Sequence, residues 1–578
     1  GITGQMFRQF ALCIPSSIGL STVVALTLAP ALCSMILKSG EEHSDFKFIQ
    51  AFDDWFNKVR DKYLEGAKVF IDSPKLTIIT FVAIMLAIVG LFRIIPTGFL
   101  PTEDKGAIFT QIQLPDGSSA SRTDAVTKEI EQELLKIPGV RSTITLVGFS
   151  GENTALIVSE LENWSKRKSK DLQMQTILAK VQKQFSTYPS ATIASFSPPA
   201  ISGLGMFGGF EFQLLDKGDR TPQEFYDEAV KLMQIANKDP HFSMVYSSYT
   251  ANLPQLLLDV DVPKAMAQGV EVTEIYNALA SYFGKSYVND FNKFGRVYRV
   301  YLQADAPFRE KQADLDKIYV KNNQGTMVPL SAVVKIKNIV GPYSQARFNM
   351  YPSIAINGMA RSGVSSGQAM GTMAAIADKN LPKDMGYAWS GSSLQEHESS
   401  GQIGPILAMS LVFIYLFLVG LYESWMLPVA VMLISPVALI GALFFQYVAG
   451  YSLDIYAQIG LVMLIGLSTK QAILIIEFAK DAHEAGMSIK DAAMQAAKLR
   501  FRAVMMTNIA FILGLLPLVF AAGAGAASRH SVGMTVFGGM MAVAFIGTFL
   551  VPAFYVMIEQ FKINVAKFIK EKRNKNNV

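Results

Sequence analysis

The sequence predicts an α-helical membrane protein that also carries a large α+β domain outside the membrane. The first observation is composition: the 578 residues have a mean hydropathy of +0.29, and only 17% of them are charged. This is too apolar for an ordinary soluble protein and too charged for a chain made only of membrane spans. The second is a set of seven long apolar segments. The third is residues 96–404, where strand and helix patterns alternate.

Each of the seven apolar segments is near or above the length of ~20 residues that crosses a bilayer as a helix. They are Phe10–Leu37, Leu76–Phe92, Pro405–Leu421, Leu427–Val448, Tyr456–Phe478, Ala503–Ala522 and Val532–Met557. Several contain Gly or Pro, which membrane helices tolerate when neighbouring helices satisfy the backbone.

Lys and Arg are concentrated in alternate loops between these segments. Residues 38–75 hold seven of them, residues 480–502 hold five and the tail after Met557 holds six, whereas the loop Gly450–Ile455 holds none. The basic loops are therefore expected in the cytoplasm, and the N-terminus and residues 96–404 outside. An external N-terminus with an odd number of spans favours the C-terminal part of a longer protein. Apolar residues at helical spacing in Phe46–Ile71 predict a helix that lies on the inner membrane face.

Residues 96–202 follow the order β-α-β-β-α-β, which is that of a ferredoxin-like unit. The expected elements are a strand in Ala107–Leu114, a helix in Ser119–Lys136, strands in Val140–Val147 and Thr154–Leu161, a helix in Leu172–Phe185 and a strand in Ala191–Phe196. A second such unit is expected from Phe210, with strands in Phe210–Leu215, Met244–Tyr249, Ser353–Met359 and Gly386–Ser390 and helices in Thr221–Asn237 and Ser365–Asp378. An insertion, Leu253–Val340, interrupts it. The repetition indicates an internal duplication.

Motifs that would indicate an enzyme or nucleotide binding do not fit their surroundings. Residues 203–208 match Gly-x-Gly-x-x-Gly, but a strand pattern follows where a dinucleotide site needs a helix. The five histidines have no metal-ligand spacing, and no Gly-x-Ser-x-Gly motif is present. No basic stripe with interleaved aromatics suggests nucleic acid. The sequence therefore favours neither an enzyme nor a nucleic-acid-binding protein.

The most informative residue is a lysine, Lys470, near the middle of the apolar segment Tyr456–Phe478. A charge at that depth costs about 2.5–3.5 kcal/mol on insertion scales, so we expect it to be buried against protein with a partner. No Asp or Glu of the seven segments lies at its depth; Glu477 is two turns away, about 10 Å along the helix axis. The partner acid is therefore expected outside this chain.

Two polar residues of the next segment lie seven positions apart and share a helix face, Arg500 and Thr507. Taken alone, Arg500 is also compatible with an anchor at the cytoplasmic edge. Thr507 is also compatible with a hydrogen bond between helices.

Five stretches are informative together: GLSTKQAILIIEFAKD, KLRFRAVMMTNIAFILGLLPLV, LYESWMLPVAVML, SYVNDF and TLAPALC. They resemble the C-terminal half of the resistance-nodulation-division (RND) transporters, closest to the proton-driven hydrophobe/amphiphile multidrug efflux pumps. The resemblance runs essentially end to end. It implies that the seven segments here are the sixth to twelfth of twelve spans. It also implies that Lys470 matches the lysine that opposes a pair of aspartates on the fourth span, and that Arg500 and Thr507 match polar residues of the same proton relay.

The resemblance also implies a division of the chain. This is a span in 1–37, a cytoplasmic amphipathic helix in 38–75, a span in 76–95, a first porter subdomain in 96–202, a second in 203–252 and 341–400, a docking or funnel subdomain in 253–340, five spans in 401–558 and a basic cytoplasmic tail in 559–578.

The partners that the resemblance implies are the missing N-terminal half with its aspartates, two further copies in a homotrimer, a periplasmic adaptor protein and an outer-membrane channel. The implied setting is the inner membrane of a Gram-negative cell. The substrates would be small and amphiphilic, and the proton gradient would serve in place of a cofactor.

Residues expected to line the substrate path share one strand face or lie near it. They are Phe109, Gln111, Gln113, Phe149, Phe196, Met206 and Phe207. Packing within the sheet or against the neighbouring unit is an equally open explanation for each.

The sequence departs from the family pattern at several positions. Gln471 follows the lysine where many relatives have Asn, and Ala503 stands where relatives often have Pro. Ile144, Val158 and Ala194 stand where such pumps carry phenylalanines of the drug pocket, so its aromatic lining is expected to be thinner. Two alternatives remain open on other grounds: export of metal ions or lipids by the same fold, and a non-transporting membrane scaffold or export-assisting protein.

Overall fold

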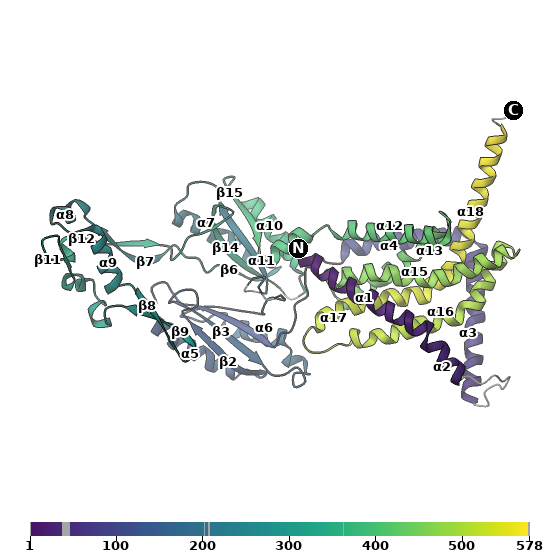
Figure 1. The fold of residues 1–578 in the computed structure, drawn as a ribbon, viewed down its shortest axis with the longest axis horizontal. Helices are drawn as coiled ribbons and strands as arrows, with labels where there is room; N and C mark the ends of the chain where they lie inside the picture. The colour runs from purple at the N-terminus through teal and green to yellow at the C-terminus, as the bar shows by residue number, and fades with distance from the viewer. Residues whose placement is uncertain (1, 37–46, 202, 206–207, 362, 576–578) are drawn as a thin grey trace.

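The computed structural model describes residues 2–36, 47–201, 203–205, 208–361 and 363–575. These residues form three parts in a row: a bundle of long helices, a middle part of two sheet-and-helix units, and a small outermost part (Figure 1). The N-terminus lies where the bundle meets the middle part, and the C-terminus lies at the far end of the bundle. The two ends therefore lie on opposite sides of the bundle, as an odd number of spans requires.

Within the described residues, seven helical segments are long and apolar enough to cross a membrane, which agrees with the predicted number of spans. Their helices are α1 (Ile2–Leu26) with α2 (Leu28–Ile36), α4 (Pro74–Ile94), α12 (Ile403–Tyr422), α13 (Leu427–Met432) with α14 (Ser435–Ala449), α15 (Ile455–Glu484), α16 (Ile489–Val519), and α17 (Ala526–Ala542), which continues through a π turn into α18 (Thr548–Lys575). Helices α14, α15 and α17 form the packed centre, whereas α1, α2 and α12 leave most of their surface open.

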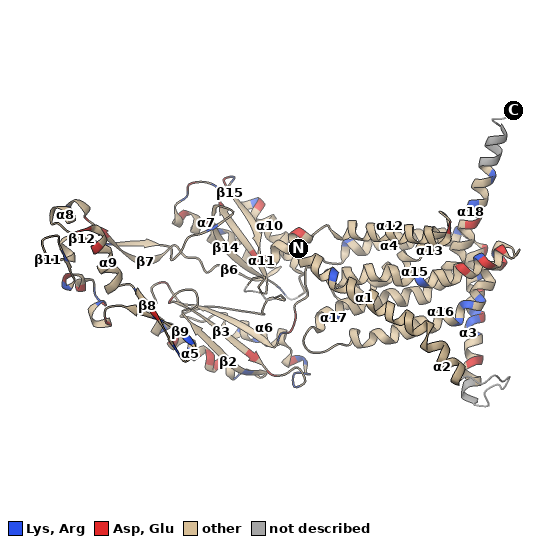
Figure 2. Ribbon diagram, in the orientation of Figure 1, with Lys and Arg blue, Asp and Glu red and all other residues tan. Residues whose placement is uncertain are grey.

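Helix α3 (Lys47–Asp72) lies across the end of the bundle, at the position predicted for the amphipathic helix (Figure 1). Its buried residues face α16 and α18: the Tyr63 ring stacks on Phe501 at 4.5 Å, and the Tyr63 hydroxyl donates a hydrogen bond of 3.2 Å to the Thr548 carbonyl. Charged residues gather at this end of the bundle and on the outer parts, whereas few lie along the spans (Figure 2). The orientation expected from the basic loops stays a prediction.

The first sheet-and-helix unit has four antiparallel strands in the order β2-β3-β1-β4. Its elements are β1 (Ala107–Gln113), α5 (Ala120–Leu135), β2 (Val140–Val147), β3 (Thr154–Leu161), α6 (Met174–Phe185) and β4 (Thr192–Phe196). Ile108 and Ile112 of β1 are fully buried in one core with Ile130 of α5 and Ile177 of α6. Because side chains alternate along a strand, Phe109 and Gln111 point to the opposite face of the sheet.

The second unit repeats this order as β6-β14-β5-β15, with a short extra strand, β13 (Ala346–Phe348), beside β14. Its elements are β5 (Phe210–Asp216), α7 (Pro222–Asn237), β6 (Phe242–Tyr246), β14 (Tyr351–Ala360), α10 (Ser366–Asn380) and β15 (Met385–Ser390). One predicted boundary was wrong: the strand expected in Met244–Tyr249 begins and ends earlier. The reason is packing, because Phe242 is buried in the core with its ring 5.6 Å from that of Phe210.

Residues 253–340 form the outermost part, with a small core of their own that includes Ile275, Leu315 and Leu330. Its strands pair two by two: β7 (Leu253–Val260) with β12 (Val334–Gly341), β8 (Ser286–Lys293) with β9 (Arg296–Leu302), and β10 (Tyr319–Lys321) with β11 (Met327–Pro329). Helices α8 (Val262–Ala267) and α9 (Val272–Tyr282) pack beside them.

The bundle and the middle part are joined by main-chain hydrogen bonds. The extended segment that leaves α4 runs beside the loop before α15, where Thr97 and Leu453 form an isolated parallel bridge and the Leu453 N–H donates to the Pro96 carbonyl at 2.8 Å. The Ile455 N–H donates to the Phe99 carbonyl at 3.1 Å. The start of α15 is therefore fixed to the segment that enters the outer domain.

Candidate functional site

The site is built on α15, whose outer end is fixed by a buried carboxylate. Asp454 caps the helix: its Oδ1 accepts hydrogen bonds from the Ala457 N–H at 2.8 Å and from the Ser531 hydroxyl of α17 at 2.6 Å. Further along, a Cβ on Gly539 of α17 would overlap the Leu464 side chain, so the two helices lie as close as a glycine allows. One side of α15 is thus packed tightly against α17, and the opposite side carries Lys470.

Lys470 lies on an exposed face of α15 together with Gly466. The structure differs here from the expectation of a buried lysine, because α12 and α16 flank this face of α15 without covering it. Among the described residues, Lys470 makes no hydrogen bond or ion pair.

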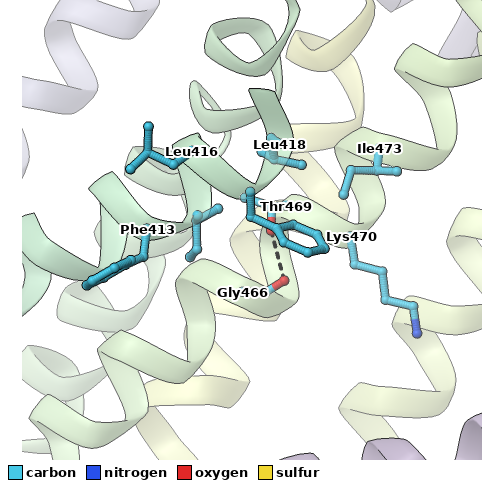
Figure 3. A pocket seen from close by; sticks show the side chains of 9 residues that line it. Phe413, Leu416, Leu418, Gly466, Thr469, Lys470 and Ile473 are labelled. Atoms are coloured by element: carbon cyan, nitrogen blue, oxygen red, sulfur yellow. Dashed lines mark hydrogen bonds between the residues drawn. The ribbon is translucent and has the colours of Figure 1, made fainter. Parts of the chain in front are cut away.

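Beside Lys470, α12 and α15 enclose an apolar groove of about 790 Å³. Its walls are Phe413, Ile414, Leu416, Phe417 and Leu418 of α12 and Gly466, Thr469, Lys470 and Ile473 of α15. Figure 3 shows the Lys470 side chain extending away from Phe413 and Leu416, so its ammonium group points away from the α12 wall. Lys470 is therefore flanked by apolar side chains of the groove, and among the described residues no acidic side chain lines the groove.

Arg500 lies on α16 and contacts α15 through an aromatic ring. Its Cζ is 3.4 Å from the centroid of the Phe478 ring, the geometry of a cation–π contact. Its Nε is buried and has no hydrogen-bond partner among the described residues. The guanidinium is therefore held against α15 by the ring contact, and its buried Nε is unpaired within the described structure.

Thr507 lies further along α16, on an exposed position. Its hydroxyl donates a hydrogen bond of 2.9 Å to the Val504 carbonyl of its own helix. Within the described structure no hydrogen bond joins Lys470, Arg500 and Thr507 to one another. The structure thus places all three on two adjacent helices but does not connect them directly.

A pair of amides that the sequence reasoning did not assign to the site lies directly behind it. Gln471 and Asn508 each follow a predicted relay residue, and the Gln471 Nε2 donates a hydrogen bond to the Asn508 Oδ1. Both side chains are buried. An amide directly after the polar residue on both helices was the signal available in the sequence.

Of the residues expected to line a substrate path, Phe109 and Phe196 are brought together. They pair across β1 and β4, and their rings meet edge to face at 6.1 Å. The Phe196 side chain is only 1% exposed, so neighbouring residues cover it in this arrangement.

The other expected lining residues are more scattered. Gln111 shares the face of Phe109 and has a buried Oε1 with no hydrogen-bond partner among the described residues. Gln113 Nε2 lies 3.5 Å from the Ser248 carbonyl of the second unit. Phe149 lies in the β2–β3 loop and is 44% exposed. Met206 and Phe207 lie outside the described residues.

The bundle of long apolar helices, the two repeated sheet-and-helix units and Lys470 are together typical of the RND class of transporters. The chain belongs to the AcrB/AcrD/AcrF family, whose model matches residues 1–559. The resemblance drawn from the sequence motifs is thereby confirmed.

Relatives with this similarity are efflux proteins. The chain is 38% identical over 571 residues to the toluene efflux pump membrane transporter TtgB of Pseudomonas putida, covering 96% of this chain and 54% of that protein. It is 37% identical over 569 residues to the multidrug resistance protein MdtF of Escherichia coli, covering 97% and 55%. The chain spans about half the length of the curated relatives it matches.

Proposed function

We propose that this chain is the C-terminal half of a proton-driven efflux transporter that exports small amphiphilic or hydrophobic compounds. The observation that carries the proposal is Lys470, a cation in the apolar bundle with no acid beside it in the described residues. A membrane-embedded charge is costly unless it meets a partner. The family resemblance supplies that partner as a pair of aspartates on a span of the other half, and the exposed face of α15 leaves room for it.

The proposed cycle is an electrostatic switch. A carboxylate beside Lys470 is held ionised by the lysine, while burial favours its protonated form, so the two effects oppose each other. Protonation removes the attraction and frees the Lys470 ammonium to turn toward another partner, with Thr507 and Arg500 on the neighbouring helix. Two positions of the lysine then bias two packings of α15 against α16.

Helix α15 would carry this change to the outer domain. Its start is hydrogen-bonded to the extended segment 96–99, which leads into the first sheet-and-helix unit. We assign the two repeated units, residues 96–202 and 203–252 with 341–400, as porter subdomains that open and close around the substrate. Residues 253–340 are assigned as the docking subdomain.

The remaining assignments rest on the names and lengths of the relatives and on the family resemblance. We propose a homotrimer in the inner membrane of a Gram-negative cell, with residues 96–404 in the periplasm. A periplasmic adaptor and an outer-membrane channel would meet the docking subdomain.

The experiment reconstitutes three preparations in vesicles with an imposed proton gradient: the chain alone, the chain with the N-terminal half of its transporter, and the pair with Lys470→Met. Of these three, only the unaltered pair should transport an amphiphilic dye. Transport should fall to background with Lys470→Met, because the acid then has no countercharge. Lys75→Met, which changes an exposed lysine outside the groove, is the matched control and should transport like the parent. Proton-coupled transport by the chain alone, or by the Lys470→Met pair, would refute the proposal.

A further inference from the structure

The amide pair Gln471–Asn508 links the two helices that carry the relay residues. Among the residues that the structure describes, it is the only side-chain hydrogen bond between α15 and α16. Gln471 is 5% exposed and Asn508 is fully buried. Lys470 and Thr507 point to the open face of the two helices, and the residues that follow them point into the contact between the helices. The pair therefore sets the rotation and height of one relay residue relative to the other.

This pair is only half satisfied. The Gln471 Oε1 and the Asn508 Nδ2 are both buried and have no hydrogen-bond partner among the described residues. The Gln471 Oε1 is an acceptor and the Asn508 Nδ2 is a donor, so these two atoms could form a second hydrogen bond with each other. Two side-chain amides can exchange two N–H···O bonds when their planes align. A buried polar group without a partner destabilises the arrangement that contains it. A small rotation of α15 against α16 that closes the second bond would therefore favour a second arrangement.

We infer that Gln471 and Asn508 are positioning residues of the proton relay: their amide pair holds α15 against α16 in two discrete arrangements, with one hydrogen bond or with two. This inference rests on the proposed function, because the two arrangements matter only if Lys470 moves. Each arrangement places the Lys470 ammonium differently with respect to the acid that faces it. A hydrophobic contact at this point would allow α15 to slide gradually along α16. The amide pair instead favours only the positions in which its hydrogen bonds form.

The test uses the complete transporter with Gln471→Leu, with Asn508→Leu and with both. Each single change should lower the rate of proton-driven export about tenfold or more, since misplacing a reacting group by ~1 Å can cost about 100-fold. The double variant should lose little beyond either single variant, because both remove the same bond. The pH at which export is half-maximal should also move, since the distance from Lys470 to its acid sets the pKa of that acid.

A swapped variant separates positioning from simple packing. Gln471→Asn with Asn508→Gln keeps two amides and the same combined length, so it should restore the rate and the pH profile that Gln471→Asn alone loses. Ser468→Ala is the matched control: Ser468 is buried on α15, but its hydroxyl bonds only to the Ile465 carbonyl of its own helix.

Two results would overturn the inference. If Lys470→Met stops export while the Leu variants keep the parent's rate and pH profile, the amide pair has no positioning role although the proposed function stands. If the Leu variants only reduce the amount of folded protein, and the rate per folded molecule and the pH profile stay those of the parent, the pair is structural. Loss of the proposed function itself would appear as export that survives Lys470→Met.

Discussion

A single carboxyl, that of Glu396, ties three segments together where the outer domain meets the bundle. It lies on α11 (Gly391–Ser399), which leads into α12. The Ser366 hydroxyl of α10 donates a hydrogen bond of 2.8 Å to the Glu396 Oε1, and the Phe99 N–H donates to the Ser366 Oγ at 3.3 Å. Burial raises the pKa of the Glu396 carboxyl to about 7, and the hydrogen bond from Ser366 opposes this only in part.

The raised pKa predicts a stability that depends on pH. Between the ordinary value of 4.5 and about 7 the folded chain keeps a proton that the unfolded chain releases, so stability falls as pH rises through this range. The loss from this group is about 3 kcal/mol at most and is complete above pH 7. Glu396→Gln keeps an amide oxygen as acceptor and cannot ionise, so its thermal unfolding should lack this fall between pH 5 and 8. Equal pH dependence in parent and variant would contradict the assignment.

At the residue scale, some site residues could be predicted from the sequence and others could not. Lys470 stands out because a charge inside an apolar run needs no structure to be noticed. Gln471 and Asn508 were not assigned to the site, because an amide in a span has many possible neighbours and only the contact between α15 and α16 shows that these two meet. For the same reason the covered ring of Phe196 could not be distinguished from an open one.

At the scale of elements, close approach of backbones governs the centre of the bundle. Helices α14 and α17 cross at two glycines: a Cβ on Gly538 would lie 2.5 Å from the Phe445 Cβ and 2.7 Å from the Gly441 carbonyl oxygen. Between membrane helices, small residues allow this contact, and tight packing then supplies the stability that water cannot.

Gly538→Ala should therefore destabilise the bundle by about 1–3 kcal/mol, because the added methyl group can only be accommodated by moving a helix. Gly514→Ala on α16 is the matched control, since a Cβ there meets nothing within 4 Å. Thermal unfolding in detergent should show a lower melting temperature for Gly538→Ala alone. Equal melting of the two variants would contradict the close crossing.

Most elements were predictable because a single pattern covers each of them. Strands β2 and β3 begin and end at the predicted residues, since alternation and flanking turns define them. Breaks inside spans were not predicted. Helix α13 ends and α14 begins just before Pro436, which lacks an N–H, and α1 gives way to α2 just before Pro30 in the same way. Whether a proline bends a span or only perturbs it depends on neighbouring helices, which the sequence does not specify.

At the scale of the whole molecule, the bundle and the outer domain are joined by backbone. We expect Leu453→Pro to uncouple them, because proline removes the N–H that donates to the Pro96 carbonyl at 2.8 Å. Export by the complete transporter should fall about tenfold or more, whereas Leu453→Ala keeps the N–H and should retain most of it. Measurement of dye export and of the amount of folded protein checks this. Export by Leu453→Pro at the parent's rate would show that the joint is elsewhere.

The backbone character of this joint has an evolutionary consequence. A connection made by N–H and C=O groups is the same for every residue except proline, so the exposed side chain of Thr97 can change while the connection persists. The buried Asp454 is constrained separately, because its carboxylate caps α15. A survey of substitutions would therefore record position 97 as tolerant, although in the proposed cycle the change in α15 reaches the outer domain there. An inhibitor directed at this joint would have to imitate a strand, and resistance to it by a change of side chain would be correspondingly hard to acquire.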